Sequence, residues 1–196
     1  RSGGKLNEQL AALYESWTQQ NPFDNGGGGW AAEPWYQQEM PLSDEQIRQA
    51  RAVSTQAVIV LGRTAGEDQD NADVEGGYRL TADEMMLLHQ VCREFDDVAV
   101  VLNTAGLIDL AWADDPLLRT RIRALLYVWH GGADGAQAAA SLLYGEVTPS
   151  GKLVGSIVKS LDDHPASPCW GAEVQNLYQE DIYVCLLYTS PSPRDS

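Results

Sequence analysis

Long apolar runs are missing from this sequence of 196 residues, and none approaches the roughly 18 residues that a membrane-spanning helix needs. The first residues also lack the charged and then apolar pattern of a secretory signal peptide. Cysteine is scarce, because Cys92, Cys169 and Cys185 are too few and too scattered for a disulfide framework, and this favours a reducing compartment. We therefore expect no membrane partner and a cytoplasmic location.

Basic residues are also few. Lys and Arg number 13 against 28 Asp and Glu, so the net charge is -15 and the isoelectric point lies near 4.4. Such a surface repels the phosphate backbone of nucleic acids, and we expect no nucleic-acid partner. What the chain does have is enough apolar content, 44% of its residues, to build one globular core.

The N-terminal part of the chain predicts a helix, a long loop and a second helix. Apolar residues recur at helical spacing over residues 6–20, which predicts an amphipathic helix. Residues 21–41 contain four consecutive glycines, three prolines and several aromatic residues, which favours a structured loop. Ser43 and Gln46 then form a capping box that opens a helix running to about residue 54.

Farther along the chain, short apolar runs alternate with helical segments. Residues 57–61, 98–103 and 124–128 have the composition of buried parallel strands. Helices are expected from the capping box of Thr81 and Glu84 to about residue 95 and over residues 133–144, with shorter strands at 153–158 and from residue 182. This alternation predicts an α/β fold, a three-layer αβα sandwich with a mainly parallel, twisted sheet.

The loop that follows the strand at 57–61 is the first candidate functional site. Five acidic side chains occur within nine residues from Glu67 to Glu75. Loops at the carboxyl ends of strands carry the chemistry in open α/β sheets. Glu67, between Gly66 and Asp68, is therefore our candidate general acid/base, and we expect the other catalytic group to lie outside this chain.

Two patterns that resemble metal sites fall short of one. The acidic cluster after residue 67 suggests calcium, but the glycine of an EF-hand loop is absent, since its position, sixth from Asp68, is Asp73. His89 and Cys92 lie one helical turn apart without a third ligand nearby, so we expect them to line the core rather than to bind zinc. We expect no metal.

Two glycine-containing segments resemble phosphate-binding motifs only superficially. Residues 145–153, GEVTPSGKL, have one residue too many for a phosphate-binding loop and follow a helix rather than a strand. Gly131, Gly132 and Gly135 do not fit a dinucleotide fingerprint; their amides either bind a hydroxyl or an anion at a helix N-terminus or serve strand-to-helix packing. We expect no cofactor.

Four stretches together resemble one known family. They are LGRTAGEDQDN, VAVVLNTAGLIDLAWADD, ALLYVWHGGADGAQAAASLLYGEVTPSGKL and EDIYV. In their order and spacing, over residues 52–184, they resemble the α/β sandwich domain of glycoside hydrolase family 3, the β-glucosidase group. The resemblance implies a domain at 51–184, preceded by an extension at 1–50 that contains a helix and a Gly/Trp-rich loop. Residues 185–196 resemble translated sequencing adapter and are expected to be non-native.

The resemblance also implies which residues act. The family's loop often has the motif G-E-G-x-D-R, which places Glu67 on the catalytic glutamate and Asp70 on the motif's aspartate, whereas Asp68 and Asn71 depart from it. The substrate-binding residues expected from this loop and from the aromatic segment are Trp30, Arg63, Asp68 and Asp70. Trp30 either stacks on a sugar ring or packs against the core.

The function implied is hydrolysis of terminal β-linked glucose or a related sugar from oligosaccharides or glycosides, with retention of configuration. A (β/α)8 barrel of the same parent chain would supply the aspartate nucleophile, so this chain alone is expected to be inactive. Two alternatives remain open at this point. One is a non-catalytic sugar-binding or scaffolding module, and the other is an unrelated flavodoxin-like domain that binds a small anion near Gly131.

Overall fold

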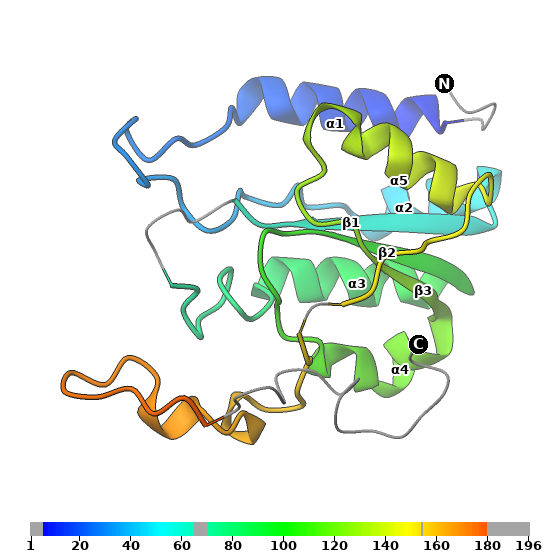
Figure 1. Cartoon of the computed structure of the whole chain (residues 1–196). Coiled ribbons are helices and arrows are strands. Elements are labelled where there is room, and N and C mark those ends of the chain that lie inside the picture. The colour runs from blue at the N-terminus through cyan, green and yellow to red at the C-terminus, as the bar shows by residue number, and fades with distance from the viewer. Residues whose placement is uncertain (1–5, 65–69, 154, 180–196) are drawn as a thin grey trace.

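Three parallel strands form the centre of the protein in a computed structural model that describes residues 6–64, 70–153 and 155–179. The strands are β1 (Gln56–Gly62), β2 (Asp97–Asn103) and β3 (Ile122–Tyr127), and their order in the sheet is β1-β2-β3 (Figure 1). Both strand pairs are parallel, with Gln56 opposite Asp97 and Val98 opposite Ile122. The parallel sheet expected from the apolar runs is confirmed.

Helices lie on both sides of this sheet. They are α1 (Glu8–Gln20), α2 (Asp44–Val53), α3 (Ala82–Glu94), α4 (Pro116–Arg121) and α5 (Gly135–Leu143), with short 3-10 turns at Ala111–Asp114, Gly132–Asp134, Leu161–Asp163 and Ser167–Cys169. In the view of Figure 1, α3 and α4 lie below the sheet and α1 and α5 above it. The α/β sandwich class is therefore confirmed. Within the described residues, no helix has the length and apolar character to cross a membrane, and the cytoplasmic location stays a prediction.

Both predicted capping boxes are present. The Ser43 hydroxyl accepts a hydrogen bond from the Gln46 amide, and the Gln46 side chain accepts one in return from the Ser43 amide. Thr81 and Glu84 make the same reciprocal pair at the start of α3. Each box satisfies amide groups that a helix start leaves without intrahelical partners, which is why local sequence alone located these two helix starts.

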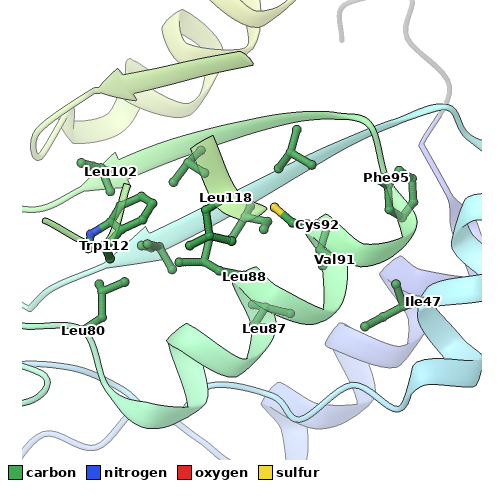
Figure 2. Packing of buried hydrophobic residues seen from close by; sticks show 14 of the residues in the cluster. Ile47, Leu80, Leu87, Leu88, Val91, Cys92, Phe95, Leu102, Trp112 and Leu118 are labelled. Atoms are coloured by element: carbon green, nitrogen blue, oxygen red, sulfur yellow. The ribbon is translucent and has the colours of Figure 1, made fainter. Parts of the chain in front are cut away.

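The core lies between one face of the sheet and helices α3 and α4 (Figure 2). Alternate residues of β2 are fully buried on this face, as strand geometry requires. They pack against Leu88 and Cys92 of α3 and Leu118 of α4, all with no exposed surface. Cys92 is thus a core residue, as expected, and its burial raises the pKa of the thiol to about 11.

The opposite face of β1 is less covered. Val58 and Val60 keep 53% and 56% of their surface exposed, whereas Ile59 and Leu61, which point to the core, keep 5% and 1%. The alternation is the one expected of a strand that buries a single face. The face of β1 that carries Val58 and Val60 is therefore only partly covered.

One prediction about local structure needs correction, and one helix was not predicted. The prediction of a strand over residues 153–158 is wrong, because residues 155–158 show no strand pairing. A short apolar run does not by itself specify a strand. Helix α4 was not predicted; Asp115 caps it by accepting from the Leu117 and Leu118 amides, and Pro116 occupies its first turn. The boundary at residue 50 lies within helix α2 and stays a prediction.

Candidate active site at the strand ends

The carboxyl ends of the three strands meet at one edge of the sheet and line a pocket of about 560 Å³. Gly62 ends β1, Asn103 ends β2, and the segment from His130 follows β3. The N-terminal loop forms the other wall. The lining residues are Phe23, Gln37, Gln38, Glu39, Gly62, Arg63, Thr64, Glu84, Asn103, His130, Gly131 and Gly132. This is the position at which an open α/β sheet binds ligands.

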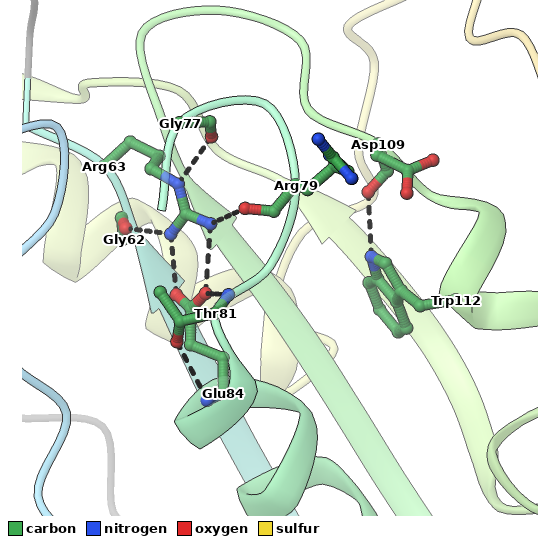
Figure 3. Close-up of polar contacts among 8 residues, drawn as sticks. All are labelled: Gly62, Arg63, Gly77, Arg79, Thr81, Glu84, Asp109 and Trp112. Carbon is green, nitrogen blue, oxygen red and sulfur yellow. Dashed lines mark hydrogen bonds and ion pairs between the residues drawn. The ribbon is translucent and has the colours of Figure 1, made fainter. Parts of the chain in front are cut away.

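Arg63 is the first residue after β1, and its guanidinium is buried, with 6% of the residue exposed. All five of its side-chain N–H groups have acceptors (Figure 3). The acceptors are the carbonyl oxygens of Gly62, Gly77 and Arg79 at 2.7, 2.9 and 3.2 Å, and the two carboxylate oxygens of Glu84 at 2.6 and 3.0 Å. No N–H group of this side chain remains for a substrate.

Glu84 completes this arrangement from the start of α3. One of its carboxylate oxygens accepts from the Arg63 guanidinium and also from the Thr81 amide, at 2.8 Å for the amide. The Arg63 guanidinium thereby joins three places in the fold: the end of β1, the chain near Gly77 and Arg79, and the N-terminus of α3 (Figure 3). The acidic loop that contains Glu67 runs between the first two of these places.

The segment that returns from the acidic loop is itself tightly folded. Arg79 pairs with the Asp73 carboxylate at 2.8 Å and donates a hydrogen bond to the Asp73 carbonyl. A Cβ at Gly77 would lie 2.6 Å from the Ala72 carbonyl oxygen, so only glycine fits there. Because its carboxylate binds Arg79, Asp73 stabilises this turn. Among the described residues, no group of three or more His, Cys, Asp or Glu side chains is placed to hold a metal ion.

The backbone at the start of the acidic loop is held as firmly as the side chain. The Arg63 amide donates to the Asn103 carbonyl at 3.0 Å, and the Thr64 amide donates to the Trp35 carbonyl at 2.8 Å. The Arg63 carbonyl lies 3.0 Å from Nε2 of His130. Residues from β2, from the N-terminal loop and from the segment after β3 thus converge on two consecutive peptide groups.

The pocket wall contributed by the N-terminal loop combines an aromatic ring with polar groups. Phe23 is 62% exposed, and the amides of Gln38 and Asn103 are exposed without a hydrogen-bond partner in the described part of the chain. Burial raises the pKa of Glu39, and the neighbouring Glu84 carboxylate adds to that rise. The pKa of the Tyr14 hydroxyl in α1 is raised to about 12, mainly by burial, and the nearby Glu39 carboxylate adds to that rise.

The catalytic and substrate-binding residues predicted from the sequence lie in different places relative to the pocket. Glu67 and Asp68 lie outside the described residues. Asp70 is exposed and Trp30 is 73% exposed, and the described lining of the pocket includes neither. Arg63 does line the pocket, but with its donors already used.

Several residues of this site were not singled out from the sequence. Glu84 was predicted only as part of a capping box. An acidic side chain in the first turn of a helix with an apolar inner face could have indicated a buried partner of opposite charge. Asn103 and His130 follow predicted strands directly, which was the available indication that they reach the strand-end pocket. Phe23 and Glu39 gave no comparable signal, since they come from an irregular loop.

Known proteins match almost the whole of this chain. The sequence profile described as the glycosyl hydrolase family 3 C-terminal domain matches residues 6–185. The chain belongs to this family. The family 3 match includes residues 6–50, which the sequence analysis set apart as an extension. Family membership removes the unrelated flavodoxin-like alternative.

Several β-glucosidases are similar to this family 3 domain. A β-glucosidase from Ruminococcus albus is 37% identical over 194 residues, covering 99% of this chain and 20% of that protein. The crystal structure of a β-glucosidase from Paenibacillus barengoltzii superposes with a TM-score of 0.88 at 55% identity, covering 94% of this chain and 20% of that one. β-Glucosidase 3B from Thermotoga neapolitana, in complex with glucose, gives 0.76 at 29% identity over 95% of this chain and 26% of that one. The chain therefore spans about a fifth to a quarter of the relatives it matches.

Proposed function

We propose that this family 3 domain belongs to a retaining β-glucosidase and supplies its acid/base residue, Glu67, from the loop after β1. The observation that carries the proposal is the anchoring of both ends of that loop through Arg63, at the edge of a polar pocket formed by the strand ends. An acid/base group must be held within narrow limits of position to be effective. The β-glucosidase relatives support the substrate class.

The reaction requires two carboxyl groups about 5 to 5.5 Å apart, one attacking the anomeric carbon and one protonating the leaving oxygen and then activating water. In this proposal Glu67 performs the second role. The nucleophile comes from a (β/α)8 barrel in the remainder of the parent chain, so this chain alone is inactive. The substrate is a glycoside or oligosaccharide with a terminal β-linked glucose or a related sugar.

The polar residues near the loop have supporting roles in this proposal. Arg63 positions the loop instead of contacting substrate as the sequence suggested, because its five N–H groups are engaged within the fold. Asp68 and Asp70 place negative charge near Glu67, and like charge favours the protonated form that a general acid needs. Trp30, with its large exposed ring, offers a surface for a sugar.

The test uses the full-length enzyme. Glu67→Gln is expected to lower kcat for glycosides with poor leaving groups by about 100-fold to 10,000-fold, with a smaller loss for activated aryl glycosides, which need little protonation. Glu67→Ala is expected to be rescued by azide on an activated glycoside, giving a glycosyl azide. The matched control is Glu75→Gln, an exposed carboxylate of the same acidic segment. Equal activity of the Glu67 and Glu75 variants would remove the assignment.

A second candidate function is sugar binding without catalysis. It is favoured by the exposed Phe23 ring and the side-chain amides of Gln38 and Asn103, which have no hydrogen-bond partner among the described residues, around one pocket. An apolar face combined with planar polar groups suits a sugar ring. Calorimetric titration of the chain with β-glucosides distinguishes it: measurable affinity that Phe23→Ala abolishes supports a binding module. A flat titration counts against it.

A further inference from the structure

The chain leaves β3 through a turn with an unusual backbone. Trp129 has a φ of 53°, and among the described residues only Ala31 is another non-glycine residue with positive φ. The left-handed region is unfavourable for a residue that carries a Cβ, so surrounding contacts must hold Trp129 there. Backbone outliers of this kind are concentrated at functional sites.

Contacts on both sides fix this turn. The Trp129 ring packs against Tyr127 with ring centres 4.5 Å apart, and the Tyr127 hydroxyl donates to the Gly106 carbonyl at 2.9 Å. On the other side, a Cβ added to Gly131 would lie 2.5 Å from the Cα of Gly135, so this position accepts only glycine without movement. The one residue between these constraints is His130.

The turn places the His130 ring against the start of the acidic loop. Nε2 of His130 lies 3.0 Å from the carbonyl oxygen of Arg63, a residue 67 positions earlier in the chain. A carbonyl oxygen only accepts hydrogen bonds, so Nε2 must carry the hydrogen in this contact. The contact is made to the peptide that leads out of β1, and it is independent of the bonds from the Arg63 side chain to Glu84.

We propose that His130 is a positioning residue for the acid/base loop, acting through the Arg63 carbonyl. Its N–H group fixes the plane of the Arg63–Thr64 peptide and so the direction in which the chain leaves the sheet. In this proposal Trp129, with its positive φ, and the closely packed Gly131 hold the ring in place from either side. The inference rests on the proposed function, because it assigns the loop a geometry that catalysis requires.

The experiment compares two amide side chains in the full-length enzyme. Gln carries an N–H group at about the distance of Nε2, whereas the shorter Asn does not reach that far. His130→Gln is expected to keep kcat within about 2-fold to 3-fold of the parent for all substrates. His130→Asn is expected to lower kcat by roughly 10-fold to 100-fold for glycosides with poor leaving groups, the effect of displacing a catalytic group by about 1 Å, and to leave activated aryl glycosides nearly unchanged.

Three results overturn the proposal. One is an equal loss on all substrates in both variants, which indicates a purely structural role. Another is a His130→Asn enzyme as active as the parent on poor leaving groups. The third concerns the double variant. If His130 acts through Glu67, adding His130→Asn to Glu67→Gln should not increase the dependence of kcat on the leaving group. A full additional loss of kcat on poor leaving groups in the double variant therefore contradicts the proposal. If Glu67→Gln alone is fully active, the proposed function fails instead, and the two failures are thus distinguished.

Discussion

Arg63 and Glu84 form a two-bonded ion pair, 2.6 and 3.0 Å long, in which the side chains keep only 4% and 6% of their surface exposed. The residues are 21 positions apart, and the pair connects the strand before the acidic loop to the helix after it. A buried pair of this kind is weak evidence for added stability, since desolvation offsets much of the attraction. Its geometry fixes one arrangement of the two elements, which we take to be its role.

Removing one partner of this pair should be strongly destabilising. Glu84→Gln leaves the Arg63 charge buried without its counter-charge, and we expect the free energy of unfolding to fall by about 3–5 kcal/mol. Arg63→Lys should also destabilise, since an ammonium group cannot make the two parallel bonds. Chemical denaturation of the chain measures both.

The exposed pair of Arg48 with Glu45, at 3.1 Å, is the matched control. Arg48→Gln should change stability far less, because solvent screens exposed pairs. A Glu84→Gln variant no less stable than Arg48→Gln would show that the buried pair has no structural importance.

The raised pKa of the half-buried Glu39 predicts that the stability of the fold depends on pH. Its pKa is raised by burial and by the nearby Glu84 and Asp83 carboxylates, so the folded state holds this proton more tightly than the unfolded state does. The resulting stabilisation is complete below the ordinary pKa of a glutamate and is lost as the pH rises through the raised value. Glu39→Gln, which carries no charge, should therefore be more stable than the parent at pH 7 and lose this advantage in acid.

Glu45 provides the opposite case. Hydrogen bonds from Arg48 and Gln49 lower its pKa, so its carboxylate stabilises the fold above the ordinary glutamate pKa and ceases to do so as the pH falls. Glu45→Gln should be less stable than the parent at pH 7. Urea unfolding midpoints at pH 4 and pH 7 check both variants, and the same sign of change for the two at pH 7 would contradict this electrostatic account.

Two glycines four positions apart should respond in opposite directions to the same substitution. A Cβ at Gly131 meets the Gly135 backbone at 2.5 Å, so Gly131→Ala forces the turn open and should destabilise by about 1–3 kcal/mol. A Cβ at Gly135, the first residue of α5, meets nothing within 4 Å, and Gly135→Ala should stabilise by up to about 1 kcal/mol. Thermal unfolding of both variants tests this. Similar shifts would indicate that the close approach at Gly131 is absent.

Sequence reasoning succeeded where structure depends on neighbours in the chain. Both capping boxes were located because a cap involves residues three positions apart, and β1 and β2 were found because buried parallel strands are continuously apolar. The strand expected at 153–158 failed because its apolar run lacks a partner strand among the described residues, and pairing is decided by the whole fold.

The catalytic loop expected after the first strand stays a prediction, and the residues that line the nearby pocket were mostly not predicted. A loop after the first strand was expected to carry the chemistry, and the described residues place a pocket at that edge of the sheet. The contacts of Glu84 and His130 with Arg63 span 21 and 67 positions, which no spacing in the sequence reveals. Arg63 was assigned to the substrate because its burial could not be read from a polar segment.

The outer side of β1 has a practical consequence for work on this chain. Among the described residues β1 pairs with β2 alone, so half of its peptide groups have no ladder partner, and Val58 and Val60 add an apolar strip beside them. An uncapped strand of this kind is a template on which another extended chain can assemble. Concentrated solutions of the isolated chain should therefore be prone to aggregation, and a lysine at position 58 or 60 is the simplest means of keeping it dispersed.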